Sequence, residues 1–495
     1  MKHSLLFLIL SAFVFFSCSK EKEQEAVVET VTVNGTITNS KTEKVTISYR
    51  TPSLDSEKIT LAELGLDSTG YFEATFELAE PVQAMVSNGE YTKVYLEPGD
   101  SLSLTIDAEE FDESVAWTGI GAEKQNYFAK KMLLNEELMA KYDGGFRGLM
   151  MLELADFELA MDSILMANKG LYTEFFDSLE VSDAFKALEE AELIADWGQK
   201  KMMYPMYHKY YSDLEEFAVP DSYYVFMEEI PMDEAYLASS NFKSYLNNIV
   251  RKEFTAYTEA NPQDSSVKEM SGYSLKMYEI ASNLEAPGPI KDFIAASQVF
   301  DYISFSGVDS IADSLMTAYK AINIDEKNLA SIEENYEKWV ILSEGKPAID
   351  FTYTSLDSTE VSLSDFVGKV VYIDVWATWC GPCMRELPSA KELHTYFGDR
   401  EDLVLLYVSI DENIDAWKKL LSEDEEFRTM GVHVIGDDAW NSSINKDYMI
   451  KGIPRYILIG KDGKIADATA PRPSSGNEIK GAIEALLTAG AVSKL

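Results

Sequence analysis

Hydrophobic and polar residues alternate along the first part of the chain. Apolar side chains occupy every second position at residues 45–49, 72–78 and 102–106, as expected where one face of a strand is buried. Glycine, proline, asparagine and serine separate these segments, for example at 88–89 and 98–100, and these residues favour turns. We therefore predict a small antiparallel β domain, built as a sandwich, over residues 31–110.

The period changes to that of a helix over residues 113–342. Ile311, Leu315 and Tyr319 illustrate it, because their spacing places them on one helical face. Glycine and proline interrupt the pattern, and one of the breaks is expected at Pro205. The tyrosine-rich stretch 204–211 is one candidate for a binding groove, but aromatic residues at helical spacing more often form a core. We predict a central all-α domain whose role the sequence does not disclose.

Residues 343–495 return to short apolar segments that alternate with helical ones. A leading hairpin is indicated at 351–354 and 361–363, and a strongly apolar strand at 370–377 precedes a helical pattern up to Phe397. The alternation continues with strands and helices at residues 403–410, 414–421, 432–435, 443–449, 455–459, 465–470 and 476–487. Such alternation predicts an α/β sandwich.

The start of the chain has the pattern of an export signal. A charged beginning is followed by an apolar run at 5–16 that is too short to span a bilayer. Residues 1–17 therefore read as a signal peptide, and Ser17-Cys18 resembles the lipidation site of bacterial lipoproteins. In that case Cys18 carries the lipid and residues 18–30 form a charged tether. The alternative is an ordinary cleaved signal with an unmodified cysteine.

Composition narrows the class of protein. The length of 495 residues predicts several domains, and an apolar content of 46% is enough to form their cores. The net charge of −41 argues against a nucleic-acid partner, because phosphate would be repelled.

From the signal-like start and Cys18, we expect a protein of the cell envelope, lipid-anchored to a membrane and facing the periplasm or the outer membrane.

The candidate chemistry lies in residues 379–383, Trp-Cys-Gly-Pro-Cys. Cys380 and Cys383 stand between a predicted buried strand and a predicted helix. Backbone N–H groups at a helix start favour a thiolate over a thiol, and the thiolate is the attacking species in disulfide exchange. A zinc site usually needs four ligands, and a structural disulfide across so short a loop removes little chain entropy. Both alternatives are therefore weaker than redox exchange, which needs no metal and no cofactor beyond the cysteine pair.

The last domain resembles a known family. The motifs GKVVYIDVWATWCGPCMRELP, GIPRYILIGKDGKI and SLSDFVGK are similar to those of exported thioredoxin-fold proteins of the TlpA/ResA-like group, related to the AhpC/TSA proteins. A peroxiredoxin would have Thr or Ser where this chain has Ala377. The strands of the first domain resemble, more weakly, an N-terminal domain of unknown function that is often fused to such lipoproteins.

The resemblance implies roles for the motif residues. Cys380 is expected to be the more exposed nucleophile, and Cys383 the buried cysteine that resolves the mixed disulfide. Gly381 and Pro382 fix the tight turn between them. Trp379 borders the site and limits access of solvent.

Two carboxylic acids are implied as partners of the cysteines. Asp374 stands in an otherwise apolar strand, where the family has an acid that exchanges a proton with the resolving cysteine. Glu386 follows Cys383 by one helical turn, and its charge would raise cysteine pKa values and offer a proton acceptor. The alternatives are a solvated Asp374 at a sheet edge and a Glu386 that only stabilises the first helical turn.

A third part of the site is implied at Ile453-Pro454, which matches the cis-proline of the family. The Ile453 backbone would pair with an extended substrate segment. Arg455 stands where threonine is usual, and this difference is expected to alter the choice of partner.

Taken together, we expect a membrane-anchored thiol–disulfide oxidoreductase that acts as a reductant or isomerase rather than as a strong oxidant. Its expected partners are exported proteins with disulfides, such as apocytochromes, and a membrane protein that donates electrons. The alternative is an envelope binding or scaffold lipoprotein, in which the β and helical domains hold a ligand and the thioredoxin-like domain is ancillary.

Overall fold

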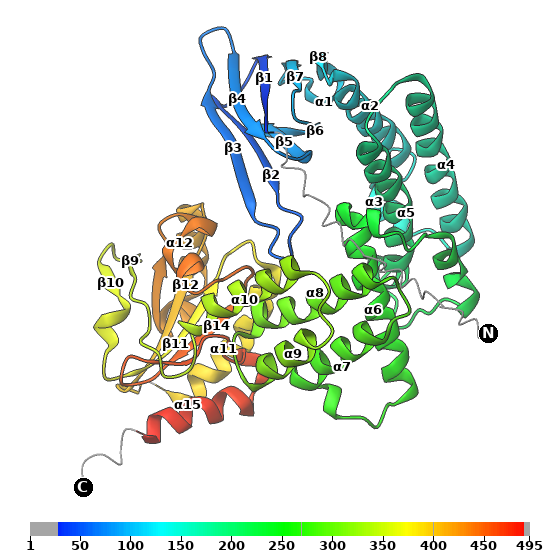
Figure 1. The fold of residues 1–495 in the computed structure, drawn as a ribbon. Coiled ribbons are helices and arrows are strands. Elements are labelled where there is room, and N and C mark those ends of the chain that lie inside the picture. Colours follow the sequence, from blue (N-terminus) through cyan, green and yellow to red (C-terminus); the bar gives the residue numbers. More distant parts are fainter. Residues whose placement is uncertain (1–27, 269, 399, 490–495) are drawn as a thin grey trace, which may run out of the picture. The chain divides into compact units, whose positions relative to one another are not determined.

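The computed structural model describes residues 28–268, 270–398 and 400–489 (Figure 1). The predicted signal peptide, Cys18 and most of the predicted tether lie outside these residues. The chain forms two compact units. The first comprises residues up to Arg50 together with Lys58–Glu137, and the second comprises Thr51–Glu57 together with the residues from Leu138 onward.

The first unit contains two four-stranded sheets. One sheet has the strand order β4-β1-β7-β8 and the other the order β3-β2-β5-β6. The strands are β1 (Glu29–Thr38), β2 (Lys44–Arg50), β3 (Lys58–Gly65), β4 (Tyr71–Leu78), β5 (Val82–Asn88), β6 (Glu90–Leu96), β7 (Ser101–Asp107) and β8 (Ala116–Ile120). Buried side chains of both sheets, such as Val33 and Val45, belong to one apolar core. The alternation in the sequence therefore marks the inward-facing positions.

The pairing of β1 departs from a purely antiparallel arrangement. β1 pairs with β4 antiparallel and with β7 parallel. The chain passes through β2–β6 between β1 and β7, so the parallel pair is closed by a long connection rather than by a hairpin. Two helices follow in the sequence, α1 (Phe111–Ser114) and α2 (Ala122–Met139).

Helices make up the next part of the chain and confirm the predicted central helical region. They are α3 (Phe146–Met150), α4 (Leu154–Ser178), α5 (Asp183–Tyr211), α6 (Ser240–Ala260), α7 (Met270–Asn283), α8 (Gly288–Ser306), α9 (Ser310–Lys320) and α10 (Glu326–Val340), with 3-10 segments η1 (Asp221–Glu229), η2 (Glu234–Ala238) and η3 (Ser266–Lys268).

The tyrosine-rich stretch of α5 lies in the core of this region, as predicted. Tyr204 is fully buried and stacks on Phe157 with 3.9 Å between ring centroids. His208 is buried as well, and its Nδ1 lies 3.0 Å from the carbonyl oxygen of Met150. The expected break at Pro205 is wrong, because α5 continues through it to Tyr211. Packing of the flanking residues holds the helix together although proline removes one backbone hydrogen bond.

A seven-stranded sheet with the order β10-β9-β13-β12-β11-β14-β15 forms the last part of the chain. Its strands are β9 (Thr352–Ser355), β10 (Glu360–Ser362), β11 (Val370–Trp376), β12 (Leu403–Ser409), β13 (Val432–Ile435), β14 (Arg455–Ile459) and β15 (Ile465–Asp467). The accompanying helices are α11 (Gly381–Phe397), α12 (Ile414–Glu423), α13 (Glu425–Thr429), α14 (Ser443–Asp447) and α15 (Asn477–Ala489), with 3-10 segments η4 (Leu363–Phe366), η5 (Ala439–Asn441) and η6 (Pro473–Ser475).

The sheet places its central strand where the sequence predicts a fully buried one. All residues of β11 are buried, because β11 pairs with β12 in parallel and with β14 antiparallel. β15 is shorter than predicted. It ends at Asp467, whose carboxylate accepts a hydrogen bond from the Thr469 N–H and so turns the chain. The predicted multidomain fold, with a β part, a helical part and an α/β part, is confirmed.

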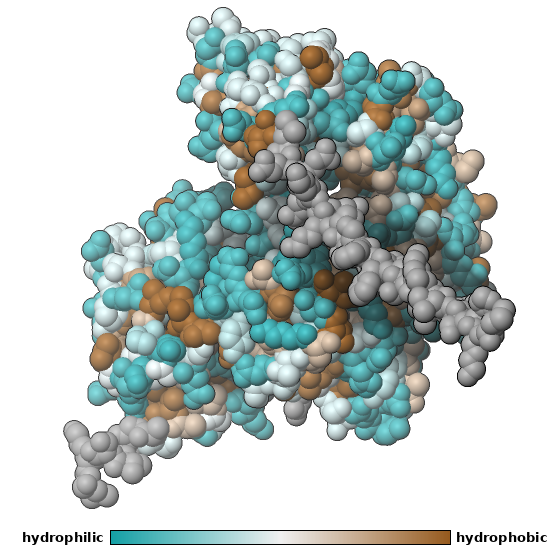
Figure 2. Space-filling model, in the orientation of Figure 1, coloured by the Kyte–Doolittle hydropathy of each residue, from teal (hydrophilic) through white to brown (hydrophobic). Residues whose placement is uncertain are grey.

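Most of the surface drawn in Figure 2 is hydrophilic, with separate hydrophobic patches. Within the described ranges, none of the helices combines the length and the apolarity that crossing a bilayer requires.

Gly35 offers a test of the sheet packing in the first unit. Gly35 lies opposite Leu104 in the β1–β7 pair, and a Cβ atom at Gly35 would lie 2.5 Å from the Leu104 carbonyl oxygen. We expect Gly35→Ala to lower the free energy of unfolding by about 1–3 kcal/mol, because two backbones must move apart. Gly65→Ala is the control, since its new Cβ would have no neighbour nearer than 3.9 Å. Chemical denaturation of the full chain measures both, and equal stability of the two variants would contradict the packing.

Candidate active site

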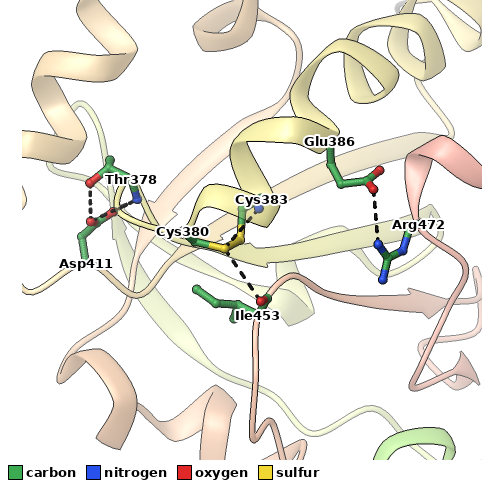
Figure 3. Close-up of a disulfide and its surroundings, with 7 residues drawn as sticks. All are labelled: Thr378, Cys380, Cys383, Glu386, Asp411, Ile453 and Arg472. Atoms are coloured by element: carbon green, nitrogen blue, oxygen red, sulfur yellow. Dashed lines mark hydrogen bonds and ion pairs between the residues drawn. A yellow bond between two sulfur atoms is a disulfide. The ribbon is translucent and has the colours of Figure 1, made fainter. Parts of the chain in front are cut away.

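The two cysteines lie at the start of α11, directly after the buried strand β11. Cys380 caps the helix, and the Cys383 N–H points to the Cys380 sulfur at 3.1 Å. The sulfurs are joined in a disulfide, with 5.2 Å between the Cα atoms (Figure 3). Pro382 stands in the first turn of α11, where its missing N–H would have no helical partner. The local sequence therefore builds the predicted strand-to-helix junction.

The expected difference in exposure between the cysteines is wrong for this disulfide-bonded form. Cys380 and Cys383 are each 4% exposed, whereas Gly381 and Pro382 between them are exposed. Cys380 is covered because its sulfur lies against the chain at Ile453, 3.8 Å from the carbonyl oxygen (Figure 3). The backbone of the turn, rather than a protruding sulfur, forms the open edge of the site.

Ile453 and Pro454 form the predicted cis peptide bond. Both residues are half-buried and precede β14, the antiparallel neighbour of β11. The Ile453 backbone therefore reaches the cysteine pair from β14, whereas the cysteines themselves stand at the start of α11. Arg455 follows in β14 and is 8% exposed. Its guanidinium donates a hydrogen bond of 3.1 Å to the Phe305 carbonyl oxygen at the end of α8, so it is turned towards the helical region.

Asp374 lies in the middle of β11 and is 6% exposed, which excludes a solvated position at a sheet edge. Its Oδ1 makes no hydrogen bond to the described residues. Burial raises the pKa of this carboxyl well above its usual value, and the negative charge of Glu386 raises it further. A buried carboxyl with a raised pKa is a stronger base than an ordinary aspartate, and such groups are common where protons are transferred.

Glu386 is buried on α11 and is held by the segment before α15. Its Oε2 accepts a hydrogen bond of 3.0 Å from the Ser474 N–H, and its Oε1 accepts one of 2.9 Å from the Ser474 hydroxyl. Nη1 of Arg472 lies 3.5 Å from the same Oε1. Figure 3 shows the carboxylate directed towards Arg472 and away from the disulfide. The charge of Glu386 acts on Asp374 through its field.

A further carboxylate, which the sequence analysis missed, holds the turn before Cys380. Asp411 is buried, and it accepts hydrogen bonds from the Thr378 N–H at 3.0 and 3.1 Å and from the Thr378 hydroxyl at 2.6 Å (Figure 3). The Ser409 hydroxyl also donates to Asp411, at 2.7 Å. The signal in the sequence was its position, because Asp411 follows the strand that pairs in parallel with β11.

Two tryptophans of the motif region have different surroundings. Trp376 is buried and packs edge-on against Phe427, with 5.3 Å between ring centroids. Trp379, next to Cys380, is 56% exposed and lies 6.1 Å from the ring of Trp440. Trp440 was also missed in the sequence; it lies in the short 3-10 segment η5, between β13 and α14. The pair leaves an exposed aromatic surface beside the cysteines.

Comparison with known proteins identifies the family of this region. Residues 343–486 match the family model described as Redoxin. The chain is 30% identical over 127 residues to the thiol-disulfide oxidoreductase ResA of a Bacillus cereus strain, covering 25% of this chain and 67% of that protein. It is 31% identical over 121 residues to ResA of Bacillus thuringiensis subsp. konkukian, covering 24% of this chain and 66%, just under two thirds, of that protein.

Solved structures show a similar relation. A putative thiol-disulfide oxidoreductase from Bacteroides vulgatus is 38% identical, and the match covers 30% of this chain and 98% of that one, with a TM-score of 0.27. The cysteine motif and the cis-proline both fall within residues 343–486, which match the family model. The chain belongs to the thioredoxin-fold family of ResA-like thiol–disulfide oxidoreductases.

Proposed function

We propose that this protein exchanges disulfides with exported proteins and works as a reductant through Cys380 and Cys383. The observation that carries the proposal is the joined cysteine pair at the start of α11 with the cis-proline loop against it. A sulfur in this position gains thiolate character from the helix N–H groups when it is reduced. A backbone carbonyl next to it can pair with an extended polypeptide.

The proposed reaction has two exchange steps. The Cys380 thiolate attacks a sulfur of the substrate disulfide, which breaks that bond, forms a mixed disulfide and releases one substrate thiolate that takes up a proton. The Cys383 thiolate then attacks the Cys380 sulfur and releases the second substrate thiolate. The substrate gains two electrons and two protons, and the protein is left with the Cys380–Cys383 disulfide. A membrane electron-donor protein with a dithiol would restore the reduced form.

Asp374 is proposed to move the proton in the second step. Its carboxylate accepts the Cys383 proton and its acid form returns it in the reverse reaction. Its raised pKa supports this role, because the carboxylate is then a stronger base than an ordinary aspartate. Asp411 supports the same chemistry from a distance, because it fixes the backbone of Thr378 two residues before the nucleophile.

The location and clients are further parts of the proposal. The signal-like start and Cys18 support a lipid anchor in the cell envelope, with the exchange site facing the periplasm or the outer membrane. Disulfide-containing exported proteins, apocytochromes among them, are the proposed clients. The Trp379–Trp440 surface beside the cysteines suits polypeptide substrates, because exposed aromatic rings bind apolar side chains.

Cysteine substitutions test the reaction. With dithiothreitol as the reductant, we expect the full chain to accelerate insulin reduction and Cys380→Ser to lower the rate to that of dithiothreitol alone. Cys383→Ser should instead accumulate the mixed disulfide, because the resolving thiol is absent. Cys18→Ser is the control and should keep the rate of the unaltered chain. Equal turnover by Cys380→Ser and the unaltered chain would favour a binding or scaffold role.

Asp374→Asn should slow insulin reduction and stabilise the fold at the same time. The rate should fall by about 10²-fold, the usual contribution of a general base. A folded acid with a raised pKa keeps its proton where the unfolded chain has lost it, so the fold loses stability as pH rises above the ordinary value of 3.8. The variant should therefore unfold at a higher temperature than the unaltered chain at pH 7, with the gap closing towards pH 4.

Asp402→Asn is the matched control, because the pKa of Asp402 is shifted in the opposite direction to that of Asp374. Hydrogen bonds from Arg400 and Lys461 lower the pKa of Asp402 to about 2, so this carboxylate stabilises the fold above the ordinary pKa. Its replacement should lower the unfolding temperature at pH 7, with the loss shrinking as pH falls. If Asp374→Asn behaved in the same way as Asp402→Asn, Asp374 would be a charged structural residue.

Glu386→Gln should lower the apparent pKa of the reactive thiol by about half a unit, because a negative charge near the site is removed. The rate of alkylation by iodoacetamide as a function of pH measures this value in the reduced chain. Glu392→Gln, an exposed position further along the same helix, is the control. An unchanged alkylation profile in Glu386→Gln would remove Glu386 from the mechanism and leave it a structural anchor for Arg472 and Ser474.

A further inference from the structure

The chain on both sides of the cis-proline contacts helix α8. Two residues before Ile453, the Lys451 ammonium lies 5.2 Å from the centre of the Phe300 ring. Directly after Pro454, the Arg455 guanidinium donates to the Phe305 carbonyl oxygen at 3.1 Å. Phe300 and Phe305 belong to the last two turns of α8. One helix of the central region therefore supports the loop that faces the Cys380 sulfur.

Arg455 is an unusual residue for this place. It is 8% exposed, and this burial lowers the pKa of its guanidinium. The negative charge of Asp467 acts in the other direction and raises that pKa. Burying a guanidinium is unfavourable by several kcal/mol unless it is paired and hydrogen-bonded. Besides Asp467, its partners are the Phe305 carbonyl and the ring of Trp339 in α10, 5.8 Å away. A buried arginine here is therefore stabilised by the helical region.

The C-terminal end of α8 has electrostatic reasons to bind this loop. The last carbonyl groups of a helix lack intrahelical partners, and a cation near them is favourable. Arg455 provides the cation and a donor for the Phe305 carbonyl, and the Thr469 hydroxyl donates to the next carbonyl, that of Ser306, at 3.3 Å. Both donors come from the α/β region, and one of them, Arg455, directly follows the cis-proline, so the α/β region caps the end of α8.

Apolar packing makes the same connection. One continuous core contains buried residues of α8, α9 and α10 together with residues of β11, β12 and β14. Phe300, Trp339 and Leu342 belong to this core on the helical side. The helices next to the cis-proline loop are therefore packed against the α/β region rather than joined to it only by the chain.

This packing leaves an aromatic side chain open to solvent where α8 ends. Phe305 is 57% exposed although its carbonyl is held by Arg455. An extended polypeptide paired with the Ile453 backbone would continue past Arg455 in one direction and past Lys451 in the other, and α8 contacts both of these residues. A small disulfide has no long extended chain that could pair along this loop.

We propose that Arg455 is a positioning residue that joins the cis-proline loop to the end of α8, so that α8 forms one wall of the exchange site. This wall, with Phe305 at its end, favours polypeptide disulfides with apolar side chains next to the cysteine over small disulfides. The inference rests on the proposed function and gives the central helical region a part in substrate selection.

The test compares two substrates in the full chain. Insulin is the polypeptide disulfide and oxidised glutathione is the small one, each reduced with dithiothreitol as the electron source. We expect Phe305→Ala and Arg455→Thr to lower the ratio of kcat/KM for insulin to kcat/KM for oxidised glutathione by about tenfold, mainly through the KM for insulin. Arg455→Lys should restore part of the ratio, because it keeps the cation at the end of α8.

The controls separate the possible outcomes. Arg428→Thr removes an exposed arginine that pairs with Glu425 on the same short helix, and it should leave the ratio unchanged. Phe305→Ala keeps the carbonyl that Arg455 binds, so it tests the wall even where Arg455→Thr fails to fold. Equal losses on both substrates, or an unchanged ratio in Phe305→Ala, would overturn the inference. If the unaltered chain reduced neither substrate, the proposed function itself would fail.

Discussion

The contact between the Cys380 sulfur and the backbone at Ile453 is the constraint on which the site depends. These atoms come from the start of α11 and from the loop before β14, and they meet only because β11 pairs with β14. The Ile453 carbonyl, which belongs to the cis peptide bond, lies against the sulfur. Asp411 holds the other side of the same turn through Thr378. The cysteine pair is thus fixed by segments next to three strands of one sheet, namely β11, β12 and β14.

Asp374 and Glu386 are both buried but have different environments. Asp374 is enclosed by β11 and its neighbours, its Oδ1 has no partner among the described residues, and burial raises the pKa of its carboxyl. Glu386 is equally buried but receives two hydrogen bonds from Ser474 and the charge of Arg472. The segment before α15 thus holds one negative charge in place, and this charge makes ionisation of Asp374 harder.

The central helices take part in this arrangement through α8. Arg455 would be an unfavourable residue in β14 of an isolated α/β domain, because nothing would accept its hydrogen bonds on the side of the missing helices. With α8 present, it completes the helix end and fixes the chain that follows the cis-proline. The residues that hold Arg455 lie in a helical region outside residues 343–486, which match the family model.

Local patterns in the sequence were sufficient for much of the fold and for the centre of the site. Alternation and helical period depend on which residues face the core, so they predicted the β, helical and α/β parts, the strand–turn–helix at Cys380 and the burial of Asp374. They failed where long-range packing competes with a local rule. Pro205 stays within α5, where Tyr204 and His208 are buried, and Cys380 is as buried as Cys383 because the Ile453 loop covers it. Glu386, Asp411 and Arg455 each form a hydrogen bond with a residue far away in the chain, at separations of 88, 33 and 150 positions. Contacts over such separations arise from sheet order and helix packing, and so only the tertiary structure decided them.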